Sequence, residues 1–146
     1  MIQASCHCTA ARFAIAAPPR WVLDCNCTLC RRYGGLWCYT FGEDAVTLVE
    51  APDPAATETY TWLDHDIATH RCRTCGGVTH LEAITRDPPA IIGLNARMMI
   101  GLDGANIPIR RIDNGHRGWF WTRDDGPIIP GRHPDEPVPG REWDWS

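Results

Sequence analysis

The sequence predicts an all-β fold organised around two metal sites. Short segments with alternating apolar residues recur at close spacing, and Gly and Pro separate them. No window of about 11 residues keeps an apolar period of about 3.6 residues, which argues against long helices. The eight cysteines occur mostly in closely spaced pairs, a pattern typical of metal ligands.

Length and charge limit the class of protein. The 146 residues suit one hydrophobic core, and the formal net charge of −4 argues against nucleic acid as a partner. No basic region precedes an apolar stretch at the N-terminus, and no run of about 18 apolar residues exists. We therefore expect no membrane partner and a cytoplasmic location, where reducing conditions keep cysteines as thiols.

Residue types exclude several kinds of catalysis. All fourteen basic residues are arginine, so Schiff-base chemistry and a phosphate-loop lysine are ruled out. Serine occurs only at Ser5 and Ser146, and neither lies in a G-x-S-x-G motif. A serine hydrolase is therefore not expected.

The first half of the chain predicts a hairpin followed by single strands. Pro18-Pro19 and Gly34-Gly35 interrupt the pattern, as does the turn-forming segment 51–54. Near position 40, Trp37, Tyr39 and Phe41 alternate with Cys38, which places the aromatic rings on one face of a strand. The expected segments are 2–8 and 11–16 for the hairpin, then 21–23, 36–41, 45–49 and 57–62.

The second half predicts a hairpin around a C-x-x-C-G element and then further strands. The hairpin strands are 67–72 and 78–84, and the later strands are 90–94, 98–102, 107–111 and 119–122. We place the domain at residues 1–123 and an extended Pro/Gly-rich tail at 124–146. Trp143 and Trp145 predict that this tail packs on the domain or on a second subunit. In the second case the protein would be a homodimer.

The first predicted metal site joins two cysteine pairs. Cys72 and Cys75 are three residues apart in a tight turn, and Gly76 can take the positive φ that lets the chain leave it. Cys6 and Cys8, two residues apart on a strand, would direct both sulfurs to one side. Four thiolates close a tetrahedral structural site, for which zinc is the default ion and iron an alternative.

Two other interpretations of these pairs are open. The cysteines can be ordinary core residues, although the C-x-x-C-G spacing argues against that. They can also form a thioredoxin-like redox pair, although the βα context of that motif is missing.

The central cluster, Cys25, Cys27 and Cys30, predicts a second site with different chemistry. Three thiolates from one segment leave a fourth zinc position for water or substrate, as in catalytic zinc sites. In the alternative, Cys38 closes the shell and the ion is inert. Against this, a lone cysteine in an apolar strand usually packs as a small hydrophobe.

Charged residues around the central cluster give weaker predictions. Arg31 and Arg32 follow the last cysteine and can hold a substrate carboxylate, or equally form solvated or structural salt bridges. The histidines show no paired metal spacing, so each is interpreted as a surface residue or a hydrogen-bonded core residue. They are His65, His70, His80, His116 and His133.

Together these motifs resemble the family of glutathione-dependent formaldehyde-activating enzymes, which includes centromere protein V. The family pattern is an N-terminal C-x-C, a central C-x-C-x-x-C-R-R and a later C-x-x-C-G. The resemblance runs from about Cys6 to Arg111 and includes the stretch 95–97. Thr9 departs from it where members often have Gly, and Asn26 and Thr28 stand where members often have His and Ser.

The resemblance implies a β-tent fold of small antiparallel sheets with two zinc ions per chain. One would be structural, held by Cys6, Cys8, Cys72 and Cys75, and the other would be held by the central cluster. The implied activity is carbon–sulfur lyase chemistry on S-hydroxymethylglutathione, with glutathione as the small thiol partner.

The sequence is compatible with two different functions. In the first, zinc on Cys25, Cys27 and Cys30 accepts the sulfur of a thiol adduct while Arg31 or Arg32 orients a carboxylate. In the second, the protein is a zinc-stabilised binding module without catalytic activity. Whether Cys38 or another protein atom fills the fourth position distinguishes them.

Overall fold

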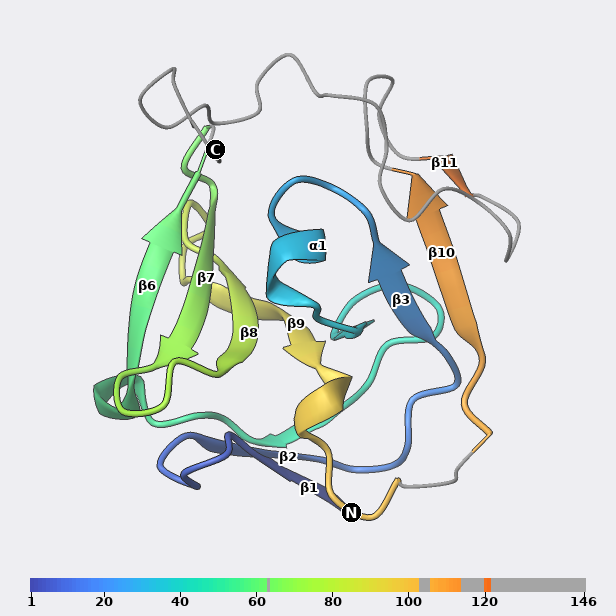
Figure 1. Ribbon diagram of the computed structural model, residues 1–146, viewed down its shortest axis with the longest axis horizontal. Helices are drawn as coiled ribbons and strands as arrows, with labels where there is room; N and C mark the ends of the chain where they lie inside the picture. Colours follow the sequence, from blue (N-terminus) through green and yellow to red (C-terminus); the bar gives the residue numbers. More distant parts are fainter. Residues whose placement is uncertain (63, 103–105, 114–119, 122–146) are drawn as a thin grey trace, which may run out of the picture.

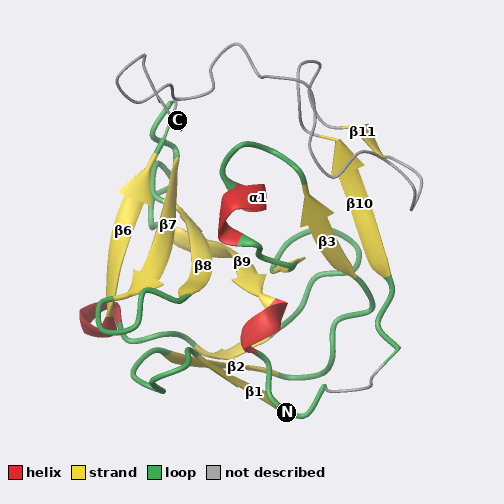
Figure 2. Ribbon diagram, in the orientation of Figure 1, coloured by secondary structure: helices red, strands yellow, loops and turns green. Residues whose placement is uncertain are grey.

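The chain is built almost entirely of β-strands. The computed structural model describes residues 1–62, 64–102, 106–113 and 120–121. Within these residues the strands form two sheets, accompanied by a short α-helix and two 3-10 turns (Figures 1 and 2). The all-β prediction is confirmed, while the tail at 124–146, with Trp143 and Trp145, lies outside the described residues.

The small sheet is formed by the N-terminal hairpin and one later strand. Strands β1 (Ile2–Ser5) and β2 (Arg12–Ile15) pair antiparallel, and β5 (Leu48–Glu50) pairs antiparallel with β2. The predicted hairpin is therefore present. In its turn Thr9 has φ 64, a left-handed conformation that is strained for a β-branched residue. Glycine would adopt this conformation without strain.

Among the described residues, the larger sheet contains eight strands. Its strand order is β11-β10-β3-β4-β9-β8-β7-β6, and the β3–β10 pair is parallel whereas the other neighbours are antiparallel. The sequence did not predict this parallel pair. The strands are β3 (Val22–Cys25), β4 (Trp37–Tyr39), β6 (Thr57–Thr61), β7 (Ile67–Cys72), β8 (Val78–Ala83), β9 (Ala90–Asn95), β10 (Ile109–Asp113) and β11 (Phe120–Trp121).

Helical segments are short. Helix α1 (Cys30–Tyr33) ends at Gly34, which has φ 63 and donates its N–H to the Cys30 carbonyl. The 3-10 turns are η1 (Pro54–Ala56) and η2 (Ala96–Met98). None of the helices in the described ranges has the length and apolar character needed to cross a membrane.

Some predicted strands were misplaced. The strand predicted at 98–102 is wrong, because Asn95 accepts a hydrogen bond from the Arg97 N–H and starts η2 there instead. Met99 keeps only an isolated bridge to Ala4. The strands predicted at 45–49 and 107–111 begin later, at Leu48 and Ile109. The strand predicted at 119–122 is described only at Phe120–Trp121.

The hydrophobic core divides around the larger sheet. In β4, Trp37 packs into one cluster while Cys38, the next residue, packs into another, as the alternation of a strand requires. The first cluster lies beside the central cysteines and contains Leu23, Cys25, Trp37, Val78, Leu81, Ala83, Ile92 and Ile112. The second faces the small sheet and contains Ala4, Phe13, Ile15, Cys38, Val46, Leu94 and Met99.

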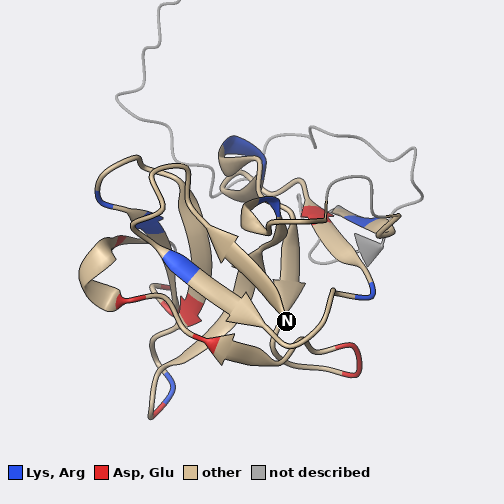
Figure 3. Cartoon of the chain, turned by 90° about the horizontal axis from the view of Figure 1, so that it is seen from below, with Lys and Arg blue, Asp and Glu red and all other residues tan. Residues whose placement is uncertain are grey.

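Basic and acidic residues are interspersed over the described chain in the view of Figure 3. Clustered positive charge is what a nucleic-acid surface needs.

Candidate metal centres

The first cysteine cluster joins the N-terminal hairpin to the β7–β8 turn. The sulfurs of Cys6, Cys8, Cys72 and Cys75 all lie within 4.8 Å of one another. Cys8 Sγ is 3.6 Å from Cys6 Sγ and 3.5 Å from Cys72 Sγ. The sequence-predicted ligand set is thus brought together, although Cys6 and Cys8 lie in the turn after β1 rather than on a strand.

Backbone N–H groups point at these sulfurs. Ala11 donates to Cys6 Sγ at 3.3 Å, and Thr74 donates to Cys72 Sγ at 3.4 Å. Hydrogen bonds from the Cys75 and Thr74 N–H groups lower the pKa of Cys72, and those from Cys8 and Gly77 lower the pKa of Cys75 to about 6. Donors directed at sulfur favour thiolates, which are the form that binds metal.

The tight turn at Cys72–Gly77 fixes this arrangement. Gly76 has φ 74 and donates its N–H to the Cys72 carbonyl, and Cys72 donates to the Gly77 carbonyl, both at 2.9 Å. The left-handed conformation explains the glycine after the second cysteine. Four sulfurs of this kind match the closed tetrahedral shell of a structural zinc site.

The second cluster lies where β3 passes into α1. Cys25 ends the strand, Cys27 lies in the connecting turn and Cys30 begins the helix, and their sulfurs are within 4.8 Å of one another. The Cys30 N–H donates to Cys27 Sγ at 3.3 Å, which holds the turn closed. The three residues predicted from spacing therefore converge on one point.

Negative charge is concentrated on one of these three sulfurs. Hydrogen bonds from Cys25 and Cys30 lower the pKa of Cys27 to about 3. The bond with Cys27 raises the pKa of Cys25 to about 12, and bonds with Cys25 and Cys27 raise the pKa of Cys30. Three adjacent thiolates repel one another, so a divalent cation is needed before all three ionise. The donor set fits zinc on this ground.

Cys38 does not join the central cluster. Its buried thiol donates to the Leu94 carbonyl at 3.7 Å, and burial raises its pKa to about 12. Over the residues that the structure describes, no fourth Cys, His, Asp or Glu ligand atom accompanies the three central sulfurs. The geometry thus leaves the three-sulfur site open to a further ligand.

The two arginines lie on α1 next to the cluster. Arg31 is half-buried, whereas Arg32 is exposed and donates from Nη1 to the Thr28 carbonyl at 2.6 Å. Arg32 therefore braces the turn that carries Cys27. Both residues follow Cys30 directly on α1, and their role in binding a carboxylate stays a prediction.

Aromatic side chains surround the same region, and sequence reasoning did not assign them a functional role. Trp21, Tyr33 and Tyr39 pack against the core cluster that contains Cys25. Burial, followed by the charges of Cys30, Cys25 and Cys27, raises the pKa of Tyr39 above its usual value. The only sequence signal was the aromatic alternation in 36–41, which also occurs in ordinary strands.

A cavity of about 230 Å³ lies beside this aromatic group. One of its acidic neighbours is fixed by local contacts, since Asp44 accepts hydrogen bonds from Trp21 Nε1 and Arg20 Nη1, both at 2.8 Å. The Arg110 guanidinium lies over the Trp21 ring at 4.6 Å. The cavity is lined by Trp21, Cys38, Tyr39, Phe41, Gly42, Glu43 and Asp44.

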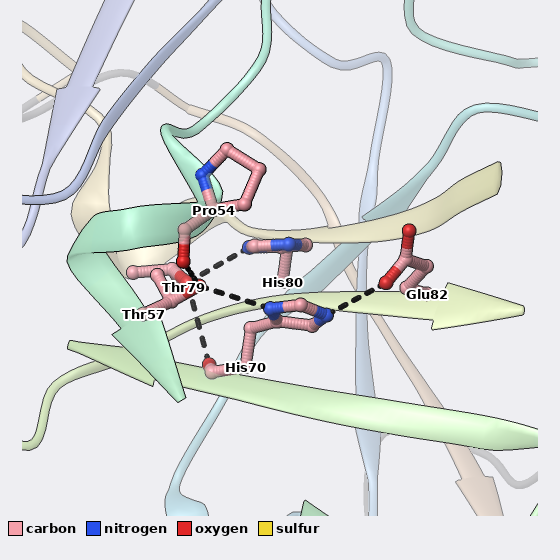
Figure 4. A network of polar contacts seen from close by, with 6 residues as sticks. All are labelled: Pro54, Thr57, His70, Thr79, His80 and Glu82. Atoms are coloured by element: carbon pink, nitrogen blue, oxygen red, sulfur yellow. Dashed lines mark hydrogen bonds and ion pairs between the residues drawn. The ribbon is translucent and has the colours of Figure 1, made fainter. Parts of the chain in front are cut away.

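Two histidines form a separate buried network (Figure 4). His70 contacts Thr57 Oγ1 at 3.0 Å through Nδ1 and Glu82 Oε2 at 2.9 Å through Nε2. His80 contacts Thr79 Oγ1 at 2.9 Å, and Thr79 donates to the His70 carbonyl. The sequence predicted either a surface position or a hydrogen-bonded core position for each histidine, and His70 and His80 take the second, whereas His116 and His133 lie outside the described residues.

The model of the glutathione-dependent formaldehyde-activating enzyme family matches residues 1–99, which include all seven cysteines of the two clusters. A crystal structure of a Rhodobacter sphaeroides protein, a structural-genomics target, is similar with a TM-score of 0.52 and 23% sequence identity. The similarity covers 73% of this chain and 98% of that chain, and at this identity it supports the fold alone. No curated protein matches the sequence.

Proposed function

The chain belongs to the family of glutathione-dependent formaldehyde-activating enzymes, and from this premise we propose that it is a zinc-dependent carbon–sulfur lyase. The proposed substrate is a glutathione adduct such as S-hydroxymethylglutathione, which the enzyme forms or cleaves. The observation that carries the proposal is the central cluster, where three cysteine sulfurs converge without a fourth ligand atom among the described Cys, His, Asp and Glu side chains.

The two clusters would have different roles. Cys6, Cys8, Cys72 and Cys75 supply a complete set of four sulfurs, so zinc there would hold distant chain segments together. Cys25, Cys27 and Cys30 supply three, so zinc there would retain one exchangeable position. All eight cysteines are free thiols in the structure, as metal binding requires.

Zinc at the central site supplies a Lewis acid that favours the thiolate form of a substrate sulfur. The protein's own part is to present the three sulfurs from one short segment and to keep them close together. Cys25 is buried, whereas Cys27 and Cys30 are half-buried, so the site can be approached from the side of the turn and α1. Arg31 and Arg32 lie on that helix, where guanidinium groups can bind the carboxylates of glutathione.

A zinc-stabilised binding module is the second candidate. One observation favours it: among the described residues, no carboxylate or imidazole lies with the central sulfurs to act as a general base. In this case the central ion would bind a thiol without turning it over. A rate measurement, rather than a binding measurement, separates the two candidates.

The first test compares metal content and glutathione binding in three proteins. We expect two zinc ions per wild-type chain and about one in Cys27→Ser, with Cys38→Ala as the matched control that removes a thiol outside both clusters. Titration calorimetry with glutathione in two buffers of different ionisation enthalpy should show binding with proton release for wild type and Cys38→Ala. Equal binding by Cys27→Ser would contradict an open central site.

The second test measures catalysis directly. Glutathione and formaldehyde interconvert with their adduct, S-hydroxymethylglutathione. The rate of this interconversion can be followed by NMR exchange spectroscopy. The lyase predicts a faster exchange with wild type than in buffer, and the same acceleration with Cys38→Ala. Glutathione binding without acceleration would instead support the binding module.

A further inference from the structure

One face of strands β6, β7 and β8 packs against the central cluster and continues past it. Cys30 and Tyr33 pack against a core cluster to which three residues of β8 belong, namely Val78, Leu81 and Ala83. Each of the three is paired with a residue of β7, and directly paired residues share one face of a sheet. The paired residues of β7 are Arg71, Thr69 and Ile67. Strand β7 therefore presents them on the side of α1, which lies between β3 and β7 in Figure 1.

Strand β6 extends this face to the end of the strand order. Tyr60 is paired with Thr69, and Glu58 is paired with Arg71. Tyr60 and Ile67 are exposed although both are large, and the side chains of Glu58 and Arg71 are 41% and 52% exposed. The face is thus covered at β8 and accessible at β6 and β7. We call the accessible part the β6–β7 shelf, formed by Glu58, Tyr60, Ile67 and Arg71.

Tyr33 connects this shelf to the central cluster. It ends α1, the helix that begins at Cys30. Burial, followed by the charge of Tyr60, raises the pKa of Tyr33. The charge of Arg71 lowers this pKa and that of Cys30 raises it, so both side chains lie within electrostatic reach of the Tyr33 hydroxyl. A ligand whose sulfur is held at the central cluster can therefore extend past Tyr33 onto the shelf.

The shelf carries an ion pair. Arg71 Nε donates to Glu58 Oε1 at 2.8 Å, which uses one N–H of a guanidinium that has several. An exposed ion pair adds little to stability, so a ligand can take over either group at small cost. The pair places a cation beside an anion. This is the complement of an α-amino acid, which carries an ammonium and a carboxylate on one carbon.

We propose that the Glu58–Arg71 pair binds the γ-glutamyl end of the glutathione adduct, with Arg71 on its α-carboxylate and Glu58 on its α-ammonium. The inference rests on the proposed function, because it needs the substrate sulfur at the central cluster. Arg31 and Arg32 are then left for the glycine carboxylate at the other end of the tripeptide. No bond forms or breaks at the shelf, so the pair selects the substrate and takes no part in the chemistry.

The test compares two thiols on variants of the zinc-loaded protein. Glutathione carries the γ-glutamyl group, whereas N-acetylcysteinylglycine keeps the thiol, the amide and the glycine carboxylate without it. Titration calorimetry measures both affinities. We expect Arg71→Met, which keeps the apolar stem, to weaken glutathione binding by about 10-fold and to leave N-acetylcysteinylglycine unchanged. Glu58→Gln should show the same selectivity, and Arg71→Lys, which keeps the charge, should recover part of the loss.

The matched control is Arg20→Met. Arg20 is also exposed and is paired with Asp44 at 2.8 Å, but it lies in the segment between β2 and β3. This variant should bind both thiols as wild type does. Zinc content and melting temperature are measured for every variant, because Arg71 directly precedes Cys72. If Arg71→Met loses zinc, Glu58→Gln gives the same test without a change next to a cysteine.

The outcomes separate this inference from the proposed function. Unchanged glutathione affinity in Arg71→Met and Glu58→Gln would overturn the inference and leave the proposed function standing. Equal weakening of both thiols would also overturn it, because the loss would then not depend on the amino-acid end. A wild type that binds neither thiol would overturn the open central site and this inference with it. Selective binding without faster adduct exchange would keep the inference and replace the lyase by the binding module.

Discussion

The imidazole rings of His70 and His80 stack in the interior, with centroids 4.0 Å apart and planes 20° apart. They face each other across the β7–β8 pair, and both are buried. Burial disfavours the charged form of an imidazole, so the fold favours neutral His80. Burial, followed by the charge of His70, lowers the pKa of His80 to about 3.

This stacking predicts a stability that falls in mild acid. Between a pH of about 6.5 and 3, the unfolded chain protonates His80 and the folded chain does not, so unfolding takes up a proton and stability rises with pH. We expect wild type to lose about 2 kcal/mol between pH 6.5 and 5 from this group. Urea unfolding of wild type and His80→Leu at both pH values isolates the contribution, because loss of zinc is common to both. An identical pH dependence in the two proteins would contradict the prediction.

Thr9→Gly should stabilise the protein. The φ of 64 at Thr9 costs a β-branched residue about 1–2 kcal/mol, whereas glycine adopts this conformation freely. Glycine loses about 0.5–1 kcal/mol through its greater unfolded-state freedom, so we expect a net gain of about 0.5–1 kcal/mol in the free energy of unfolding. Thermal denaturation of zinc-loaded protein measures it. Thr9→Ala, which keeps the strain and loses the Arg12 contact at Thr9 Oγ1, should not stabilise.

Gly35→Ala should destabilise the loop after α1. A Cβ at Gly35 would lie 2.7 Å from Cζ2 of Trp37, and this indole is fully buried and cannot move aside. Overpacking of a rigid core typically costs about 1–3 kcal/mol. Gly34→Asn is the control, since the Gly34 position is open and asparagine tolerates its φ of 63. Equal unfolding free energies for the two variants would show that the loop relaxes around the new methyl group.

The two clusters should differ in what their loss does to folding. Cys72→Ser removes one of four sulfurs that join segments 64 residues apart, so we expect an unfolded or aggregated product. Cys27→Ser should lose only the central zinc and remain folded, because its cluster lies within one short segment. Circular dichroism with elemental analysis checks both. A Cys72→Ser protein with native spectrum and melting temperature would contradict the structural role.

The sequence was most informative where chemistry depends on spacing. Both cysteine clusters could be assigned because C-x-C and C-x-x-C place sulfurs together locally, and because two such pairs together supply the four thiolates of a tetrahedral site. Helix α1 could not be predicted, since four residues from Cys30 to Tyr33 are too few to show an apolar period. The apolar run near Met99 was wrongly assigned to a strand, because composition alone does not distinguish a strand from a 3-10 turn.

The other features that the sequence did not predict depend on contacts between residues far apart in the chain. The histidine network takes Thr57, His70 and Glu82 from three different strands, and their pairing depends on the register of the sheet. Tyr39 acquires its place beside the cavity only when β4 is set between β3 and β9. Neither arrangement leaves a local pattern in the sequence.

The parallel pairing of β10 with β3 places a strand from outside the residues matched by the family model beside the strand that ends at Cys25. Ile112 lies opposite Cys25, and its carbonyl accepts the Asn26 N–H at 3.4 Å. The family match ends at residue 99, so the segment that borders the strand of Cys25 lies outside the matched residues. Shortening the chain after residue 102 would keep every cysteine and still convert that strand into a sheet edge with open backbone groups. Strand β10 therefore covers the edge of the strand that carries Cys25, although it supplies none of the three central sulfurs.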